Sequence, residues 1–550
     1  MLNLLDLSKM PLGPDDGPPV MDVLPPDIMP IVILSGSDYE MGYQYGQQAG
    51  SYIERSGDAA WGKMLQKFSR PEVINALKAN QHYIKKSIPE CIDQMRGIAD
   101  GATACGYKVS YIDVLLLNVC LDLQDTLAKP GTCAYPQGAE KETLPPKGCS
   151  VCSAWGSATK DGRLIGVDSF DGPDPLYAVV IVAFPESGNN YVCAAGAGEL
   201  ASHFLMNNQG LFVGNSGGGD SQRGVDFDYG LNWTCSLPHI VRFANNATEA
   251  KDMMTSWQIN SPENFHFVDV KGNAFVVEKS AAIQGVREPG DFGEKDFLFS
   301  TNNYLTEAMR LIEEGEFVKR HGGYGRGSAV SRNIMLWDML HNYHGKVDVE
   351  FAKMMLRFPG NLPPNASEGM RDTKICRLLN NWVAVLQPDN GNEGVVHICT
   401  GSAGRVVSTP AGRNTSLPVV DGTHTFCQLK LAASPKEVVQ AARTSAEEDI
   451  GAANERLKQM NYTDTGYAAL KEIYSLAYAE YLWGSNALTK GFLAEGKKAL
   501  PHFARAATAF TRSQAHAKQV YEALVPPPVS PFDLGLEPFG GDWGDWEIDT

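Results

Sequence analysis

The dipeptide Gly148-Cys149 divides the sequence into two stretches of different character. Residues 130–147, which precede it, are polar and rich in proline and glycine, a composition typical of exposed loops where chains are cut. A thiol beside an unhindered glycyl carbonyl can attack its own peptide bond, and hydrolysis of the resulting thioester would leave Cys149 as a new N-terminus. The freed α-amino group titrates near neutrality, so it can serve as general base for its own side chain. The junction therefore predicts a self-cleaving chain with a cysteine nucleophile.

Strand-like runs follow Cys149. Short apolar and β-branched runs, separated by Gly, Asn and Asp, predict strands at 164–167, 176–184, 191–195, 211–215, 265–269, 274–278, 394–399 and 426–431. A further strand is predicted at 30–34, and helical spacing predicts helices through most of 39–129 and at 238–257, 328–343 and 434–524. Strand runs with helices grouped between them favour an α+β fold, in which antiparallel sheets carry helices on the outside.

Four short motifs occur in a fixed order along the chain. They are GSDYEMGYQYG at 36–46, CSVCSAWGSATKDG at 149–162, MNNQGL at 206–211 followed by Asn215, and STNNYL at 300–305. One short motif would be weakly specific, whereas four in order are strongly specific.

In these motifs the chain resembles the N-terminal-nucleophile (Ntn) hydrolases, and more closely the peptidase C45 family of penicillin acyltransferase-like autoproteolytic proteins. The resemblance implies a four-layer αββα sandwich, a cleavage site between Gly148 and Cys149, two self-derived chains that stay together, and no cofactor. Together with the composition of each part, it divides the chain into a helical N-terminal segment 1–148, a catalytic sandwich 149–433, a helical region 434–525 and a tail 526–550.

The resemblance also implies roles for individual residues. Cys149 is the implied nucleophile. Asn302 matches the asparagine of the family's Thr-Asn-His element, with Asn303 in the place of its histidine, and Asn215 matches an asparagine of the oxyanion hole. Both Asn302 and Asn215 are therefore candidate donors to the developing oxyanion. Cys152 is a competing nucleophile, but the β-branched residue before it would crowd the attack.

Further candidates come from shorter matches. Asp171 matches the aspartate of a Gly-Arg-Asn-x-Asp segment in the related choloylglycine hydrolases, although Val167 stands where that pattern has arginine. Ser331 and Arg332 resemble a Ser-Arg pair of the acyltransferase, and Arg332 could hold a substrate carboxylate through two hydrogen bonds. Trp155 completes the implied substrate-binding set. The structural alternatives are a turn cap for Asp171 and a solvated helix-start arginine for Arg332.

Charge and cysteine usage argue against several classes of protein. The net charge of −17, from 47 basic and 64 acidic residues, comes with no basic stripe that would bind nucleic acid or an anionic membrane. No apolar run approaches the roughly 20 residues of a membrane helix.

The 11 cysteines lack the spacing of a disulfide scaffold, and the Cys149-x-x-Cys152 pair has no second pair to complete a zinc site, so no metal is expected. The first thirty residues lack a secretory signal, which favours the cytoplasm unless a signal has been removed.

These observations predict an amidohydrolase or acyltransferase of the Ntn type that acts on a linear C–N amide bond of a small N-acyl or amide substrate through a Cys149 thioester. Three alternatives remain open: transfer of the acyl group to an amine, a phospholipase B-like lipid hydrolase, and a non-catalytic binding scaffold. Intact Gly148, Cys149 and Asn302 favour a catalyst over a scaffold. The sequence leaves open whether the protein forms a homo-oligomer.

Overall fold

The computed structural model describes residues 28–119, 123, 126–127, 149–171, 177–218, 227–311, 324–358, 375, 380–403, 425–464, 466–528 and 531–536. Within these ranges, the side chains of 324–328, 330, 331, 531 and 532 are not described. Gly148 and the Pro- and Gly-rich residues 130–147 lie outside the described residues, as does the tail from 537 onward.

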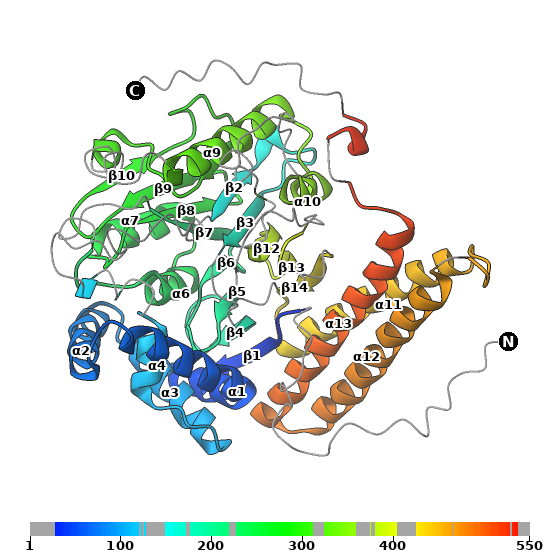
Figure 1. The fold of residues 1–550 in the computed structure, drawn as a ribbon, viewed down its shortest axis with the longest axis horizontal. Helices are drawn as coiled ribbons and strands as arrows, with labels where there is room; N and C mark the ends of the chain where they lie inside the picture. The colour runs from blue at the N-terminus through cyan, green and yellow to red at the C-terminus, as the bar shows by residue number, and fades with distance from the viewer. Residues whose placement is uncertain are drawn as a thin grey trace.

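Two sheets form the centre of the molecule (Figure 1). In order across it, the eight-stranded sheet contains β1 (Ile31–Gly36), β4 (Ala178–Pro185), β5 (Tyr191–Gly196), β6 (His203–Asn207), β7 (Leu211–Gly217), β8 (Glu263–Asp269), β9 (Ala274–Lys279) and β10 (Gln284–Arg287). The six-stranded sheet contains β11 (Phe297–Ser300), β2 (Ser150–Ala154), β3 (Ile165–Asp171), β12 (Asn380–Gln387), β13 (Val395–Thr400) and β14 (Cys427–Lys430). Paired strands run antiparallel, except that β1 and β4 are parallel.

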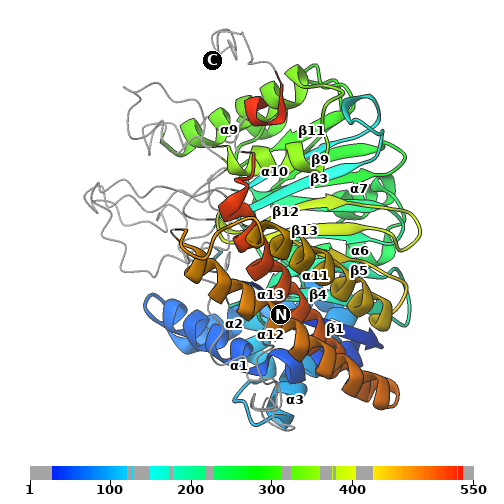
Figure 2. The ribbon, with the colours of Figure 1, turned by 90° about the vertical axis from the view of Figure 1, so that its right-hand side faces the viewer.

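Helices cover the outer face of each sheet, which gives four layers (Figures 1 and 2). One apolar core joins the eight-stranded sheet to α1 (Asp38–Leu65), α2 (Arg70–Ser87), α3 (Glu90–Ala104), α4 (Tyr111–Leu117), α6 (Trp233–Phe243) and α7 (Ala247–Ser256). Another joins the six-stranded sheet to α9 (Tyr324–Asn342) and α10 (Val349–Arg357). A third fills the space between the sheets. The predicted α+β fold with helices outside two packed sheets is confirmed.

Alternation along β2 decides which side chains reach the space between the sheets. Cys149, directly before the strand, and Val151 lie in the core between the sheets, whereas Cys152 and Ala154 lie in the core under α9 and α10. Successive side chains of a strand point to opposite faces, so a shift of one position along β2 would move the thiol to the other core. The fold therefore places Cys149 inside the sandwich.

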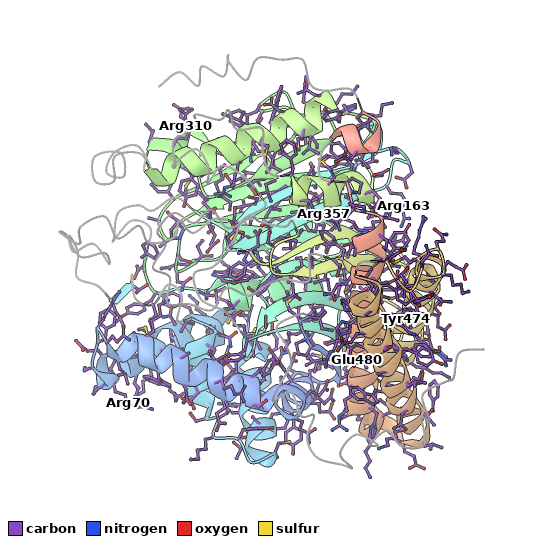
Figure 3. All side chains as sticks on the ribbon, turned by 45° about the vertical axis from the view of Figure 1, so that its right-hand side comes forward. Arg70, Arg163, Arg310, Arg357, Tyr474 and Glu480 are labelled. Atoms are coloured by element: carbon purple, nitrogen blue, oxygen red, sulfur yellow. The ribbon has the colours of Figure 1, made fainter. Side chains whose placement is uncertain are left out.

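Three long C-terminal helices close one end of the sandwich beside β1 and β14 (Figure 2). They are α11 (Pro435–Leu457), α12 (Tyr467–Leu493) and α13 (Leu500–Leu524). Val439, Phe503 and Phe510 belong to the core between the sheets. Arg357, labelled in Figure 3, is the last residue of α10. Its guanidinium lies 3.4 Å from the carboxylate of Glu522, so this ion pair joins α13 to the helices over the six-stranded sheet. In the part of the chain that the structure describes, no helix is both long and apolar enough to cross a membrane.

The first sequence motif, residues 36–46, holds the N-terminal helices against the sheet. Its helix α1 fastens the edge strand β1 through two glutamines, since the amide of Gln44 bonds both backbone groups of Ser35 and the amide of Gln48 bonds both backbone groups of Ile33. Side-chain amides that pair with strand backbone satisfy groups that an edge strand would otherwise leave open. The motif therefore has a structural role, because it joins α1 to β1 of the sandwich.

Glycines in this motif allow α1 and α3 to approach closely. A Cβ atom at Gly46 would lie 2.1 Å from the carbonyl oxygen of Ile98, so we expect Gly46→Ala to lower the free energy of unfolding by about 2 kcal/mol or more. Gly62 is the matched control, because it lies exposed on the same helix with nothing within 4 Å of its Cβ position. Gly62→Ala should stabilise by about 0.5–1 kcal/mol. Urea titration of both variants measures these changes, and equal effects would contradict the close packing.

The helix and strand predictions are mostly correct, with informative differences. The helical run 39–129 contains α1 to α4, and the run 434–524 contains α11 to α13. The predicted helix 238–257 is two, because Asn246 caps α7 by accepting a hydrogen bond from the backbone N–H of Glu249 at 2.9 Å. Five strands lie outside the predicted strand ranges: β2, β6, β10, β11 and β12.

Candidate active site

Cys149 lies at the entrance to β2 with 7% of its surface exposed. Pairing of β2 with β3 sets Ser150 opposite Ser169 and Val151 opposite Asp168. Because Cys149 points between the sheets, its sulfur faces groups on the inner faces of both. Its backbone carbonyl and the next side chain face the helical layer instead.

Arg332 of α9 links the nucleophile to Asn302. Its Nη1 donates hydrogen bonds to the carbonyl oxygen of Cys149 and, at 2.8 Å, to Oγ of Ser150. Its Nη2 donates to Oδ1 of Asn302 at 2.9 Å. The guanidinium is 99% buried, so these charge-assisted bonds act away from water. Arg332 is therefore a buried clamp and not a solvated residue at a helix start.

The clamp also fixes the amide orientation of Asn302. Because Arg332 can only donate, the atom that faces it must be the oxygen, and the NH₂ group points the other way. That group donates one hydrogen bond to the carbonyl oxygen of Gly217 at 3.0 Å. The second N–H has no acceptor among the described residues, so it can serve a developing oxyanion.

Hydrogen bonds from several elements fix the loop that carries Asn302. The carbonyl oxygen of Thr301 accepts hydrogen bonds from Ser216 Oγ at 2.9 Å and from Asn264 Nδ2 at 2.7 Å. Its hydroxyl donates to the carbonyl oxygen of Ala329 at 2.8 Å. Oδ1 of Asn303, at the position where the resembled pattern has histidine, accepts a hydrogen bond from Asn333 at 2.7 Å and lies 3.0 Å from the Thr301 hydroxyl, whose one proton is shared between it and Ala329. Asn303 thus completes the support of the loop.

Asp168 and His203 lie beside Cys149, and sequence reasoning assigned them no role. Oδ1 of Asp168 is 3.2 Å from Nδ1 of His203, and both side chains are at least 98% buried. Burial alone would lower the pKa of His203, but the Asp168 carboxylate and a hydrogen-bonding interaction with the Cys149 thiol outweigh it and raise the pKa to about 10. The imidazole is therefore positively charged at neutral pH.

Two of the sequence candidates lie on the wrong faces of their strands to meet the thiol. Asp171 accepts hydrogen bonds from Ser169, at 3.1 Å, and from Asn380, on the face of β3 that holds Val167 under the helical layer. Asn215 is two residues from Val213, which faces the helices of the other sheet. The structure brings together Cys149, Asn302 and Arg332, and does not bring Asp171 or Asn215 to them.

The remaining candidates also lie apart from the sulfur or outside the description. Trp155 follows β2, six residues from Cys149, which is about 20 Å along a strand. Ser331 belongs to α9, but its side chain is not among those described. Gly148, the other half of the expected cleavage site, lies outside the described residues. Cys152 faces away from Cys149, and burial raises the pKa of its thiol well above the ordinary value, which disfavours it as a nucleophile.

Glu199, in the turn between β5 and β6, interacts electrostatically with His203. Its buried carboxyl makes the stability of the folded chain depend on pH. Burial raises the pKa of Glu199 from 4.5 to about 7, so the folded chain must ionise a buried carboxyl when the pH exceeds that value. Since the folded state binds the proton more tightly, stability falls as pH rises from about 4.5 to about 7. We expect Glu199→Gln to match wild type near pH 5 and to be more stable near pH 8 by on the order of 2 kcal/mol.

Urea titration at the two pH values checks this prediction. Glu186→Gln, on an exposed turn between β4 and β5, is the control and should show no divergence between them. A wild-type stability that rises from pH 5 to pH 8 relative to Glu199→Gln would contradict the prediction.

No family model matches the sequence. An uncharacterized protein of Archaeoglobus fulgidus is 26% identical over 365 residues, which cover 60% of this chain and 58% of that protein. The chain thus spans less than two thirds of the length of this relative.

Several solved structures are similar to parts of this chain. Penicillin V acylase from Agrobacterium tumefaciens is 13% identical with a TM-score of 0.29, covering 46% of this chain and 83% of its own. The Caenorhabditis elegans ortholog of N-acylethanolamine-hydrolyzing acid amidase is 13% identical with a TM-score of 0.30, covering 44% and 93%. A mutant of conjugated bile acid hydrolase from Clostridium perfringens is 12% identical with a TM-score of 0.29, covering 46% and 89%. TM-scores this low establish neither a shared fold nor a shared activity.

Proposed function

We propose that this chain is a self-processing hydrolase of the Ntn type, in the manner of the peptidase C45 family, that cleaves a linear C–N amide bond through a thioester on Cys149. The observation that carries the proposal is the buried Arg332 clamp. One guanidinium holds the backbone carbonyl of the nucleophile and the amide oxygen of Asn302. A sulfur nucleophile and an amide donor oriented by the same guanidinium are the two kinds of group that acyl transfer requires.

In this proposal the Cys149 sulfur attacks the substrate carbonyl carbon. The oxygen then gains negative charge, and the second N–H of Asn302 stabilises it in a buried site where hydrogen bonds are strong. The nitrogen leaves as an amine, and water releases the acid from the thioester. Arg332 holds the Cys149 backbone and the Asn302 side chain in place during both steps.

The packing of residues before Gly148 supports two cleaved chains that stay associated. β1 pairs with β4, and Val32, Leu34 and Met41 share a buried core with Val179 and Ile181. Separation of a 1–148 chain from a 149–550 chain would expose this core to water. We therefore expect a non-covalent heterodimer, in which the N-terminal chain contributes β1 to the eight-stranded sheet and α1 to α4 to the helical layer over it.

The substrate test uses a panel of soluble amides and a lipid control. We expect release of an acid and an amine from one or more members among N-acyl amino acids, aryl amides and β-lactam side-chain amides, with little turnover of phospholipid vesicles. Iodoacetamide should abolish the activity by alkylating the nucleophile. Cys152→Ala is the matched control and should retain activity, because Cys152 lies three residues after Cys149 and on the opposite face of β2.

Two outcomes would change the proposal. Phospholipid turnover without amide turnover would replace it with the lipid-hydrolase alternative. Hydroxamate formation that outpaces acid release, when hydroxylamine is added, would make the chain an acyltransferase to amines.

A further inference from the structure

We propose that His203, oriented by Asp168, is a catalytic residue that carries the proton in the Cys149 reaction, both in self-cleavage and in amide turnover. This inference rests on the proposed function, because it assigns a role within the same site. It departs from a mechanism in which the α-amino group of Cys149 is the only base.

The strand that bears His203 is distorted where the histidine lies. β6 leaves regular pairing with β5 between Val192 and Ala194, because Ala194 pairs with His203 while Val192 pairs with Met206. Two residues of β6 thus face one residue of β5, which is a β-bulge. Phe204 adopts a φ of 38°, in the left-handed region that bulky residues rarely enter. Backbone strain of this kind gathers at functional sites, where it aims a side chain.

One carboxylate holds both His203 and the first bulge residue, Phe204. Oδ2 of Asp168 accepts a hydrogen bond from the backbone N–H of Phe204 at 3.3 Å, while Oδ1 holds the imidazole. Three aromatic rings pack around the imidazole, with centroids 4.3, 5.6 and 6.3 Å away: Phe170, Trp233 and Trp382. The ring therefore has a fixed orientation, which a proton-transfer group needs.

Three titratable groups face the imidazole from the elements packed around it. Asp168 comes from β3, Cys149 from the start of β2, and Glu199 from the turn before β6. Asp168 is the hydrogen-bonded counter-ion of the ring, and the proposal adds Cys149 as its second partner, with the thiol proton held on the imidazole. Glu199 interacts with the imidazole electrostatically, and no hydrogen bond joins these two described side chains.

Self-cleavage is the step for which His203 matters most. In the uncleaved chain the nitrogen of Cys149 belongs to the peptide bond with Gly148, so no α-amino group exists to act as base. In the proposed ion pair His203 already holds the thiol proton, so the sulfur forms its bond to the Gly148 carbonyl carbon without a further proton transfer. When the C–N bond breaks, the imidazolium gives that proton to the departing nitrogen of Cys149. Formation of the thioester therefore needs no proton from outside the Cys149–His203 pair, and water enters only when the thioester is hydrolysed.

Amide turnover repeats the same cycle. The thiolate bonds to the substrate carbonyl carbon, the C–N bond breaks, and the imidazolium protonates the leaving amine. Water then attacks the thioester and gives a proton to the neutral imidazole. Breakage of the C–S bond releases a carboxylic acid and restores the thiolate and imidazolium.

The test compares His203→Gln with His266→Gln in the full chain. Gln can keep a hydrogen bond to Asp168 but cannot exchange a proton. His266 is the matched control, a second buried histidine between the sheets, whose Nε2 lies 2.8 Å from Ser153 Oγ and whose pKa burial lowers to about 3. Thermal unfolding first confirms that each variant is folded. Two readouts follow, namely conversion of newly translated chain into fragments, and iodoacetamide labelling of the Cys149 peptide across pH.

We expect His203→Gln to slow self-cleavage by about 10²-fold or more, as loss of a general acid–base group does. Labelling of Cys149 near pH 6 should fall by about tenfold or more, because the thiolate loses its cationic partner. His266→Gln should behave as wild type in both readouts. Wild-type rates of cleavage and labelling in a folded His203→Gln would overturn the inference.

Two further measurements keep the outcomes separate. If His203→Gln does not fold, nitrogen-15 NMR of the wild-type chain decides, since His203 should carry protons on both ring nitrogens near pH 8 and a singly protonated ring would overturn the inference. Cys149→Ala tests the proposed function itself. An active Cys149→Ala would remove that function, whereas an inactive Cys149→Ala beside a fully active His203→Gln would remove only the role of His203.

Discussion

Cys149→Ala is expected to remain a single chain and to lose amide turnover by at least about 10⁴-fold. The reason is that a nucleophile that forms a covalent intermediate has no substitute once its reactive atom is gone. The fold should tolerate the change, since the alanine leaves space beside Val151 without placing a polar group between the sheets. Mass spectrometry of the purified variant and a discontinuous assay for released amine measure the two effects.

Cys152→Ala is the comparison that makes this result specific. It removes the other thiol of the same segment, but from the face under α9 and α10. Full processing and activity in Cys152→Ala, beside loss of both in Cys149→Ala, would identify the nucleophile. Loss of processing and activity in Cys152→Ala, with both retained in Cys149→Ala, would contradict the conclusion that Cys149 is the thiol that faces the site.

Asn302→Ala carries the second large expected effect. In a chain that is already processed, kcat should fall by about 10²–10³-fold with a small change in KM, because an oxyanion donor acts mainly in the transition state. Asn302→Asp separates this role from support of Arg332, since it keeps an oxygen for the guanidinium and loses the NH₂ donor. Both variants should therefore be similarly slow. Near-normal kcat in a processed Asn302→Ala would reassign the residue to structure.

Asn215→Ala tests the other asparagine that the sequence suggested. The structure places Asn215 on the helical side of β7, so we expect less than about a tenfold change in kcat. A loss as large as that of Asn302→Ala would favour the sequence motif over the geometry.

Much of the fold can be predicted from the sequence because each layer has its own pattern. Short β-branched runs separated by Gly and Asn give most strands of the eight-stranded sheet, and helical spacing gives the outer layers. β6 was not predicted because its bulge at Phe204 breaks the alternation that identifies a strand.

The candidate site could be predicted only in part, for a physical reason. Both faces of each sheet are buried, so alternation along a strand does not show which face meets the partner sheet. The predicted strand 164–167 ends before Asp168, and β3 in fact runs on to Asp171. Extending the alternation beyond Val167 places Asp168 and Asp171 on opposite faces of the strand. It does not show which of the two faces Cys149.

Other parts of the site depend on contacts that no local pattern encodes. His203 meets Asp168 across the gap between the sheets, and Arg332 reaches Cys149 from a helix 183 residues along the chain. The resemblance suggested that Arg332 binds substrate, whereas the structure places it on the nucleophile's own backbone and on Asn302.

The state of the bond between Gly148 and Cys149 tests the central claim most directly. Intact mass measurement of the purified wild-type chain, with N-terminal sequencing of the larger product, reads it without any knowledge of the substrate. The account predicts two chains, residues 1–148 and 149–550, with the second beginning Cys-Ser-Val-Cys. A wild-type chain that stays full length after prolonged incubation, and is nevertheless active on an amide, would contradict it.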